Sequence, residues 1–148
     1  MKFKVLDSRL NEEAYQLKAG SAGANSIDLR ACIKEPLAIY AGQQVMIPTG
    51  IQVALPKDSI GMLLPRSGLG SKGLVLGNLV GNIDPDYRGE INACLWNRNS
   101  EGSIVINPMD KIVQFVVGFT YSPATWEQVE ELDTTERGSN GFGSTGVE

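Results

Sequence analysis

The sequence predicts an all-β protein built as a β-sandwich or barrel, with at most one short helix. Seventeen Gly and seven Pro are spread over the 148 residues, so the chain is divided into short segments that leave little room for long helices. Between these turn residues lie short apolar or alternating segments about 8–12 residues apart, which is typical of a sandwich or barrel. A chain of this length fits one domain.

The predicted strands are short and are bounded by Gly, Pro or polar turns. They cover residues 2–6, 26–33, 37–40, 44–47, 51–55, 61–64, 74–76, 90–96, 103–106 and 111–119. In the second of them the apolar residues fall on one face, and Asp28 and Arg30 fall on the other. Residues 66–73 contain too many glycines for a strand and leave room for one helical turn. Residues 122–132 fit either a helix or an extended edge.

The composition excludes several kinds of chemistry. The chain has no histidine, which removes Ser-His and Cys-His nucleophilic pairs and imidazole metal sites. A general base must then be a carboxylate or, less readily, a lysine or tyrosine. Cys32 and Cys94 are expected as free thiols, and the absence of a C-x-x-C motif leaves zinc without support.

Charge and hydropathy limit the possible partners. A net charge of −4 argues against general nucleic-acid binding, which needs a basic face. No apolar run approaches the roughly 20 residues of a membrane span. The first residues lack the long apolar region of a signal peptide. We therefore expect a cytoplasmic protein with neither a membrane nor a nucleic-acid partner.

The stretch from Gly77 to Gly89 is the first candidate for a functional site. Its first half places glycines around Leu79 and Val80, which predicts a tight β-hairpin whose tip needs positive φ or a close backbone approach. Its second half, from Asp84 onward, is a turn with two carboxylates, a tyrosine and an arginine. Such a hairpin could bind a small planar ligand, although a Gly-rich turn with solvated charges has the same composition.

Three other segments place hydrogen-bond donors beside glycine or within a strand. They are Arg66-Ser67-Gly68, Gln114, and Arg137 with the glycines of the tail. Together with the acidic turn they indicate a polyphosphate ligand and a divalent metal carried on its phosphates. None of them is a P-loop. The tail itself is either a disordered end or a lid that closes over a ligand.

These residues lie in five motifs that resemble, in order and over nearly the whole chain, those of the homotrimeric dUTPase family. The motifs are SIDLRA at 26–31, PRSGLG at 65–70, GNIDPDYRGEI at 81–91, DKIVQ at 110–114 and RGSNGFGSTG at 137–146. The resemblance implies a jelly-roll-like β domain over residues 1–136, a flexible C-terminal lid over residues 137–148, and three active sites at the subunit interfaces of a homotrimer. It also implies hydrolysis of dUTP to dUMP and pyrophosphate with Mg²⁺, which removes dUTP and supplies dUMP for thymidylate synthesis.

The resemblance also assigns roles to single residues. Asp84 would be the general base that activates the attacking water, since an ordinary aspartate is ionised at neutral pH. Gln114 would contact the α-phosphate and this water. Tyr87 would pack on the deoxyribose and exclude a 2′-hydroxyl. Asp28 would approach the magnesium ion through a water molecule.

Further residues are implied to bind the substrate. The uracil edge would be read by Asn78 and by the hairpin backbone from Gly77 to Ile83, which includes Gly81. Such a pocket rejects a base that leaves its polar groups unpaired. The phosphates would be held by residues of a neighbouring subunit, namely Arg66, Ser67 and Gly68. The closed tail would contribute Arg137, Phe142, Gly143, Ser144 and Thr145, with the phenylalanine stacked on the uracil.

Two positions depart from the usual motifs. Ser26 stands where glycine usually lies two residues before the aspartate of the first motif, and Asn140 stands where the tail commonly has glycine. Asparagine tolerates positive φ, so the second change is mild. The motif around Asp84 and Tyr87 is intact.

Two alternative functions are compatible with these residues. dCTP deaminases resemble this family in fold and phosphate motifs, and Glu90 could supply the acid/base group that deamination needs. A regulatory binding protein could also use the same fold to respond to a nucleotide. The loop from Asp84 to Tyr87 and the tail residue Phe142 match the hydrolase better.

Overall fold

The computed structural model describes residues 1–120 and 123–135, and within them the protein is built almost entirely of strands. The strands are β1 (Lys2–Val5), β2 (Ser26–Arg30), β3 (Leu37–Tyr40), β4 (Gln44–Pro48), β5 (Ile51–Ala54), β6 (Ser59–Pro65), β7 (Leu74–Leu76), β8 (Gly81–Ile83), β9 (Asn92–Asn97), β10 (Ser103–Ile106) and β11 (Lys111–Phe119). One α-helical turn, α1 (Ser67–Gly70), and two 3-10 turns, η1 (Ser8–Asn11) and η2 (Pro123–Thr125), complete the described elements. The prediction of an all-β chain with at most one short α-helix is confirmed.

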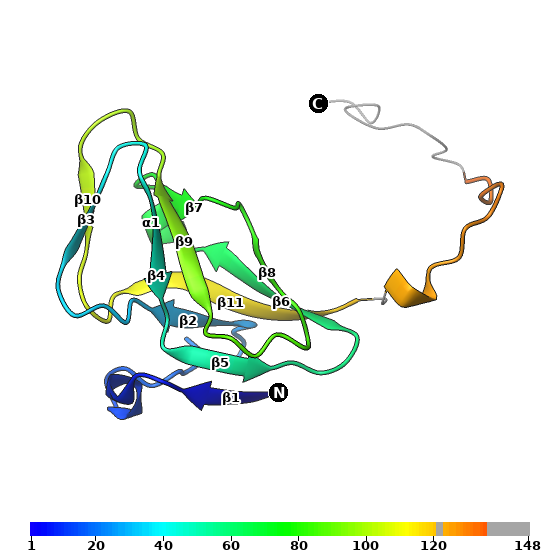
Figure 1. The fold of residues 1–148 in the computed structure, drawn as a ribbon, viewed down its shortest axis with the longest axis horizontal. Helices are drawn as coiled ribbons and strands as arrows, with labels where there is room; N and C mark the ends of the chain where they lie inside the picture. Colours follow the sequence, from blue (N-terminus) through cyan, green and yellow to red (C-terminus); the bar gives the residue numbers. More distant parts are fainter. Residues whose placement is uncertain (121–122, 136–148) are drawn as a thin grey trace.

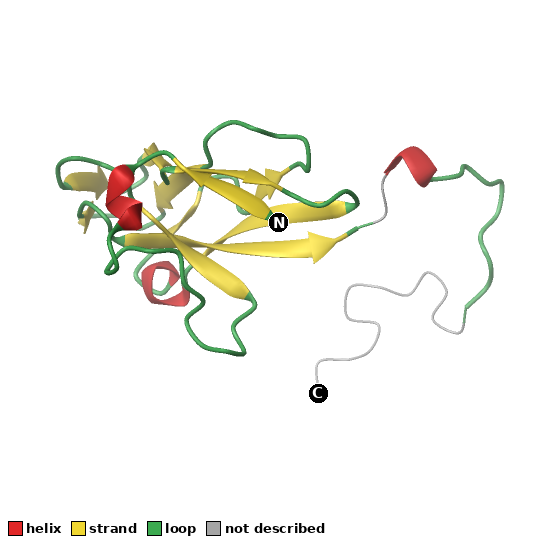
Figure 2. Ribbon diagram, turned by 90° about the horizontal axis from the view of Figure 1, so that it is seen from below, coloured by secondary structure: helices red, strands yellow, loops and turns green. Residues whose placement is uncertain are grey.

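The strands form four antiparallel sheets that stack around a shared core (Figures 1 and 2). The largest sheet has the order β2-β11-β6-β8, and a three-stranded sheet has the order β4-β9-β7. Two further pairs, β1-β5 and β10-β3, join segments that are far apart in the sequence. This non-sequential pairing gives the predicted jelly-roll-like sandwich.

The core is aliphatic, and the alternation along each strand decides which side chains enter it. Leu29, Leu63 and Leu95 are at most 2% exposed, whereas Asp28 and Arg30 stay half-exposed on the opposite face of β2. Each fully buried Leu stabilises the fold by about 1.5–3 kcal/mol relative to an exposed one. The face assignment predicted for this strand is therefore confirmed.

The predicted hairpin after residue 76 is wrong as a pairing of two neighbouring strands. β7 pairs with β9, and β8 pairs with β6, so the chain between them crosses from one sheet to the other. The glycines serve close approach, because a Cβ at Gly77 would lie 2.7 Å from Gln44 Oε1 and one at Gly81 would lie 2.9 Å from Leu63 Cβ. The positive φ belongs to Leu79, at 64°.

The segment after β11 differs from both alternatives that the sequence allowed. η2 spans only Pro123–Thr125, and no regular element follows in the described residues up to 135. Trp126 is 74% exposed and Leu132 is 84% exposed. Figure 1 shows this segment leaving the β domain, although Pro123 and Trp126 line a pocket together with Asp84 and residues 57–60 of that domain.

Three smaller findings complete the fold. The turn η1 was not predicted, although Asp7 caps it by accepting a hydrogen bond from Arg9 N. Cys32 and Cys94 are free thiols, as predicted, and burial raises the pKa of Cys32 to about 12. No helix in the described part of the chain is long and apolar enough to cross a membrane.

We expect Asp7 to contribute stability that depends on pH. Its carboxylate accepts a hydrogen bond from Arg9 Nε at 2.9 Å, and this bond lowers the pKa of Asp7. A lowered pKa contributes stability above the unfolded-state value of about 3.9, and this contribution is lost as the pH falls through the folded-state value. Asp7→Asn should therefore lower the free energy of unfolding at pH 7 by about 1 kcal/mol.

Urea unfolding at pH 7 and pH 3 measures this contribution. The deficit of Asp7→Asn should shrink at pH 3, which is below the unfolded-state pKa, because the unfolded chain then binds a proton at this carboxyl group that the folded chain binds less readily. Glu101→Gln, at an exposed turn, is the matched control and should change little at either pH. An equal deficit at both pH values would mean that Asp7 acts through packing and not through its charge.

Candidate active site

The loop after β8 carries Asp84 in a turn that a backbone hydrogen bond closes. Tyr87 N donates to Asp84 O at 3.1 Å. Arg88 Nη1 donates to Pro85 O at 2.7 Å and to Tyr87 O at 2.9 Å, so a side chain of the loop stabilises the loop's own backbone. The Asp84 side chain is exposed and has no hydrogen-bond or ion-pair partner among the described residues. It can therefore accept a hydrogen bond from water.

A small pocket of about 290 Å³ lies beside this loop. Five predicted site residues line it, namely Asn78, Gly81, Ile83, Asp84 and Tyr87. Asn82, within the predicted backbone stretch, and Glu90, considered for the deaminase alternative, line it too, whereas the sequence analysis missed Met46, Leu63 and Asn92. Alternation along β4 and β9 could have indicated that Met46 and Asn92 point outward, but not which pocket they face. The structure thus brings the predicted base and sugar residues together.

β8 offers an unpaired backbone edge at this pocket. It is the last strand of its sheet and, among the described elements, pairs only with β6. The outer edge of an edge strand presents alternating N–H and C=O groups without partners. These groups can pair with a planar ligand that has donors and acceptors along one edge.

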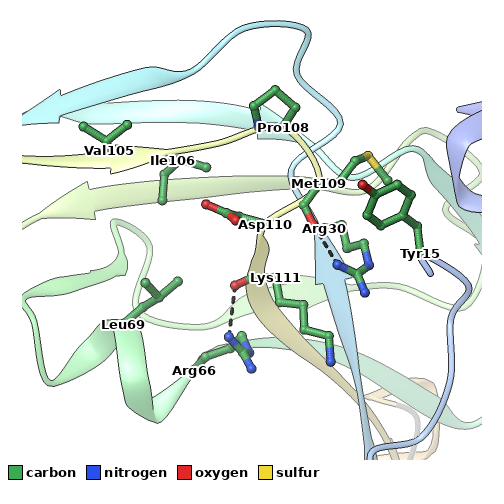
Figure 3. A pocket seen from close by; sticks show the side chains of 10 residues that line it. All are labelled: Tyr15, Arg30, Arg66, Leu69, Val105, Ile106, Pro108, Met109, Asp110 and Lys111. Atoms are coloured by element: carbon green, nitrogen blue, oxygen red, sulfur yellow. Dashed lines mark hydrogen bonds between the residues drawn. The ribbon is translucent and has the colours of Figure 1, made fainter.

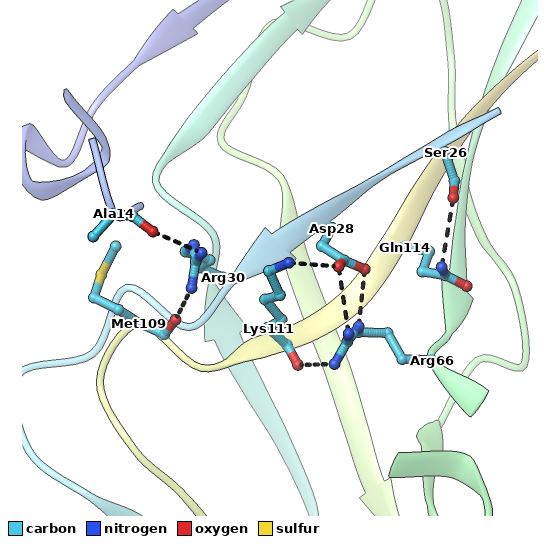
Figure 4. Close-up of polar contacts among 8 residues, drawn as sticks. All are labelled: Ala14, Ser26, Asp28, Arg30, Arg66, Met109, Lys111 and Gln114. Carbon is cyan, nitrogen blue, oxygen red and sulfur yellow. Dashed lines mark hydrogen bonds and ion pairs between the residues drawn. The ribbon is translucent and has the colours of Figure 1, made fainter. Parts of the chain in front are cut away.

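The predicted phosphate residues form a second group on the outer face of the largest sheet (Figure 4). Arg66 Nε donates to Asp28 Oδ1 at 2.8 Å, and Lys111 Nζ lies 3.1 Å from Asp28 Oδ2. Arg66 also donates through Nη1 to Lys111 O at 3.1 Å. Two cations thus share one carboxylate, and the cluster keeps one net positive charge.

Gln114 joins this group through the strand register. It lies directly opposite Asp28 on β2 and Leu64 on β6, so the three side chains share one face. Gln114 Nε2 is 3.5 Å from Ser26 Oγ, a long contact that a ligand can replace (Figure 4). Ser67 and Gly68 lie exposed at the start of α1, next to Arg66.

A pocket of about 530 Å³ opens beside Arg66 (Figure 3). Its lining includes three cationic side chains, Arg30, Arg66 and Lys111, and one acidic side chain, Asp110. Arg30 donates to Met109 O at 2.8 Å and lies 5.2 Å from the ring centroid of Tyr15. This end of the sheet is locally positive although the whole chain carries a net charge of −4.

The two groups stay apart within one chain. Asp84 lines the small pocket of about 290 Å³ and a second one of about 700 Å³, and neither shares a residue with the pocket beside Arg66. One chain therefore presents the Asp84 pocket at one place and the cationic cluster of Arg66 and Lys111 at another. The tail residues Arg137, Phe142, Gly143, Ser144 and Thr145 lie outside the described residues.

The described residues do not fit a resident metal site. No group of three or more acidic, cysteine or histidine side chains in residues 1–120 and 123–135 is arranged to hold a metal ion. Asp28 is engaged by Arg66 and Lys111, so a carboxylate contact to a metal would have to compete with two ion pairs. The water-mediated contact expected for Asp28 stays a prediction.

Comparison with known proteins shows which family the sequence is similar to. The sequence model of the dUTPase family matches residues 12–146. The deoxyuridine 5′-triphosphate nucleotidohydrolase of Paraburkholderia phymatum is 46% identical over 147 residues, covering 97% of this chain and 95% of the relative. That of Hydrogenovibrio crunogenus is 46% identical over 149 residues, covering 99% and 96%.

A solved structure gives the same result for the fold. The dUTPase of Staphylococcus bacteriophage 80alpha superposes with a TM-score of 0.80 at 25% identity, covering 99% of this chain and 98% of that one. A family match across most of the sequence, close relatives over almost the full length and a shared fold all point the same way. The chain belongs to the dUTPase family.

Proposed function

We propose that this chain hydrolyses dUTP to dUMP and pyrophosphate, at sites that copies of the chain share in a homotrimer. The observation that carries the proposal is the Asp84 carboxylate, which has no partner among the described residues. Its loop is closed by hydrogen bonds of its own and lies beside a pocket at the edge of β8 that no other described strand covers. The family supports the same reaction, because the relatives in P. phymatum and H. crunogenus are named for dUTP hydrolysis.

The proposed chemical step is attack of water on the α-phosphorus. Asp84 takes a proton from the water as its oxygen forms a bond to the α-phosphorus. The bond from the α-phosphorus to the oxygen that bridges the α- and β-phosphates then breaks, which releases pyrophosphate. A carboxylate suits this role better than a lysine or a tyrosine, and the chain has no histidine that could serve instead. Gln114 would hold the water or an α-phosphate oxygen through its amide.

Uracil and deoxyribose would occupy the smaller pocket. The edge of uracil carries an N–H between two C=O groups, which is complementary to the free backbone edge of β8 and to the Asn78 amide. A cytosine would place a donor where the site expects an acceptor, and the unpaired polar groups would cost affinity. Tyr87 lines the same pocket and would cover the sugar.

The phosphates would be bound by Arg66, Ser67 and Gly68 of a neighbouring copy. Within one chain the cationic group and the Asp84 pocket are separate, so a single triphosphate needs the cationic group of another copy. The face that carries Asp28 and Gln114 also carries half-exposed apolar side chains, such as Met62 and Val116, which could pack in an interface. Three copies related by a cyclic axis would close such heterologous contacts.

Magnesium would enter as part of the substrate. Mg²⁺ usually binds phosphate oxygens and keeps several waters, so it needs few protein ligands. Bound in this way it would neutralise charge on the triphosphate, and Asp28 could contact one of its waters. The tail from residue 137 to 148 would close over the nucleotide, with Phe142 on the uracil. A cytoplasmic location suits a substrate of the nucleotide pool.

A nucleotide panel tests the proposed reaction. With Mg²⁺ present, the purified chain should release pyrophosphate from dUTP and much less from dCTP, UTP and dTTP, because only uracil on deoxyribose fits both recognition elements. Ion-exchange chromatography of the products and a pyrophosphate assay measure this. Ammonia released from dCTP would replace the proposal with a deaminase, and turnover of none of the four would remove the enzyme.

Substitution of the base tests the chemical step. Asp84→Asn should lower kcat for dUTP by about 10²–10⁴-fold while binding of a non-hydrolysable dUTP analogue is retained, since shape is kept and the proton acceptor is lost. The matched control is Asp86→Asn, which changes an exposed carboxylate in the same loop and should leave kcat within about twofold. Near-normal turnover by Asp84→Asn would reject Asp84 as the base.

Complementation tests the shared site. Asp84→Asn and Arg66→Ala chains should each be almost inactive alone, but mixed trimers formed by co-expression should recover activity. If base and phosphate residues come from different copies, random mixing leaves about a quarter of the sites with both groups intact. Steady-state kcat per site measures this fraction. Absence of recovery in trimers shown to be mixed by mass spectrometry would place the whole site in one chain.

A further inference from the structure

Gly89 leaves room for the Tyr87 ring to fold back over the chain. A Cβ at position 89 would collide with the Tyr87 hydroxyl and would lie 2.5 Å from its Cζ. Gly89 is not among the residues with positive φ, so the requirement is steric and not conformational. Any larger residue at position 89 would push the ring away from its present place.

The Tyr87 side chain is fixed at its far end as well. Its hydroxyl donates to Glu90 O at 3.0 Å, while its backbone N–H donates to Asp84 O at 3.1 Å. The ring is still 43% exposed, so one face is free to meet a ligand. The hydrogen bonds at its hydroxyl and at its backbone N–H therefore hold this exposed face of Tyr87 in one orientation.

Glu90 is in turn bound to a buried turn between β4 and β5. Its Oε1 accepts a hydrogen bond from Gly50 N at 2.8 Å. The next residue, Ile91, accepts from Thr49 Oγ1 at 2.6 Å and from Thr49 N at 3.1 Å, and Thr49 is only 1% exposed. Glu90 O, the acceptor for Tyr87, therefore has a fixed position relative to the core.

We propose that Gly89 and Glu90 are positioning residues that set the preference for deoxyribose over ribose by immobilising Tyr87. The inference rests on the proposed function, in which this ring covers the sugar. A ring that cannot tilt has no room for a 2′-hydroxyl beneath it, whereas a ring released from its tie could move aside. Selectivity then depends on how rigidly Tyr87 is held as well as on its presence.

Kinetics with dUTP and UTP on matched variants test this inference. Gly89→Ala should reduce the ratio of kcat/KM for dUTP to that for UTP about tenfold, and part of the change should be a rise in kcat/KM for UTP. Gly20→Ala is the control, because a Cβ there meets nothing within 4 Å, and its ratio should equal that of the wild type. In a Tyr87→Ala background, Gly89→Ala should leave the ratio unchanged.

Glu90 gives a second and independent arm if Gly89→Ala fails to fold. Glu90→Ala removes the acceptor for Gly50 N and should reduce the ratio in the same direction, whereas Glu90→Gln keeps an acceptor oxygen and should restore it. A purely structural role would lower kcat/KM for both nucleotides equally.

The outcomes separate the two proposals. A wild-type preference for dUTP that survives both Gly89→Ala and Glu90→Ala overturns this inference alone. The inference also fails if the ratio of kcat/KM for dUTP to that for UTP falls equally with and without the Tyr87 ring. Positions 89 and 90 would then act independently of the ring. A wild-type chain that does not prefer dUTP over UTP overturns the proposed function, and the inference falls with it.

Discussion

The place of the Asp84–Tyr87 loop depends on one tight turn, Thr49–Gly50, between β4 and β5. Gly50 has φ of 70°, and a Cβ there would lie 2.6 Å from Cys32 Sγ, so only glycine fits. Its carbonyl accepts a hydrogen bond from Leu6 N at 2.7 Å, and its amide donates to Glu90. The turn therefore joins the N-terminal segment to the far end of the loop. A buried donor or acceptor that lost its partner here would destabilise the fold by about 1–3 kcal/mol.

Electrostatics explain how an acidic chain can serve a polyanionic substrate. The net charge is −4, but exposed charges more than about 8 Å apart are largely screened at physiological salt. A phosphate bound at the proposed site would meet the local cluster, where Arg66 and Lys111 outnumber Asp28. Asp28 orients both cations and leaves one positive charge uncompensated. The same carboxylate is thereby less available as a metal ligand, so the magnesium ion of the proposed reaction would arrive on the triphosphate.

The strands were largely predictable because each one carries its own alternation or apolar run between turn residues. The helical turn at Ser67–Gly70 followed from the glycines that exclude a strand there. The hairpin prediction failed because glycines indicate that the backbone is crowded or bent at their positions. They do not indicate which strand the backbone approaches there. In β7 and β8 the partners are β9 and β6, and this choice depends on burying Leu76 and Leu63 in the same core. The hydrogen bond from Gly50 N to Glu90 could not be predicted from the sequence either, because the two residues are 40 positions apart.

The sequence by itself determined the fold class and supplied the candidate residues for the proposed chemistry, because composition, alternation and motif order are local properties of the chain. Tertiary structure alone decided how these residues are grouped. Strand pairing between distant segments put Asp28, Gln114 and Arg66 on one outer face and put the Asp84 loop at the free edge of β8. No periodicity encodes that separation, since it follows from which apolar faces pack together in the core.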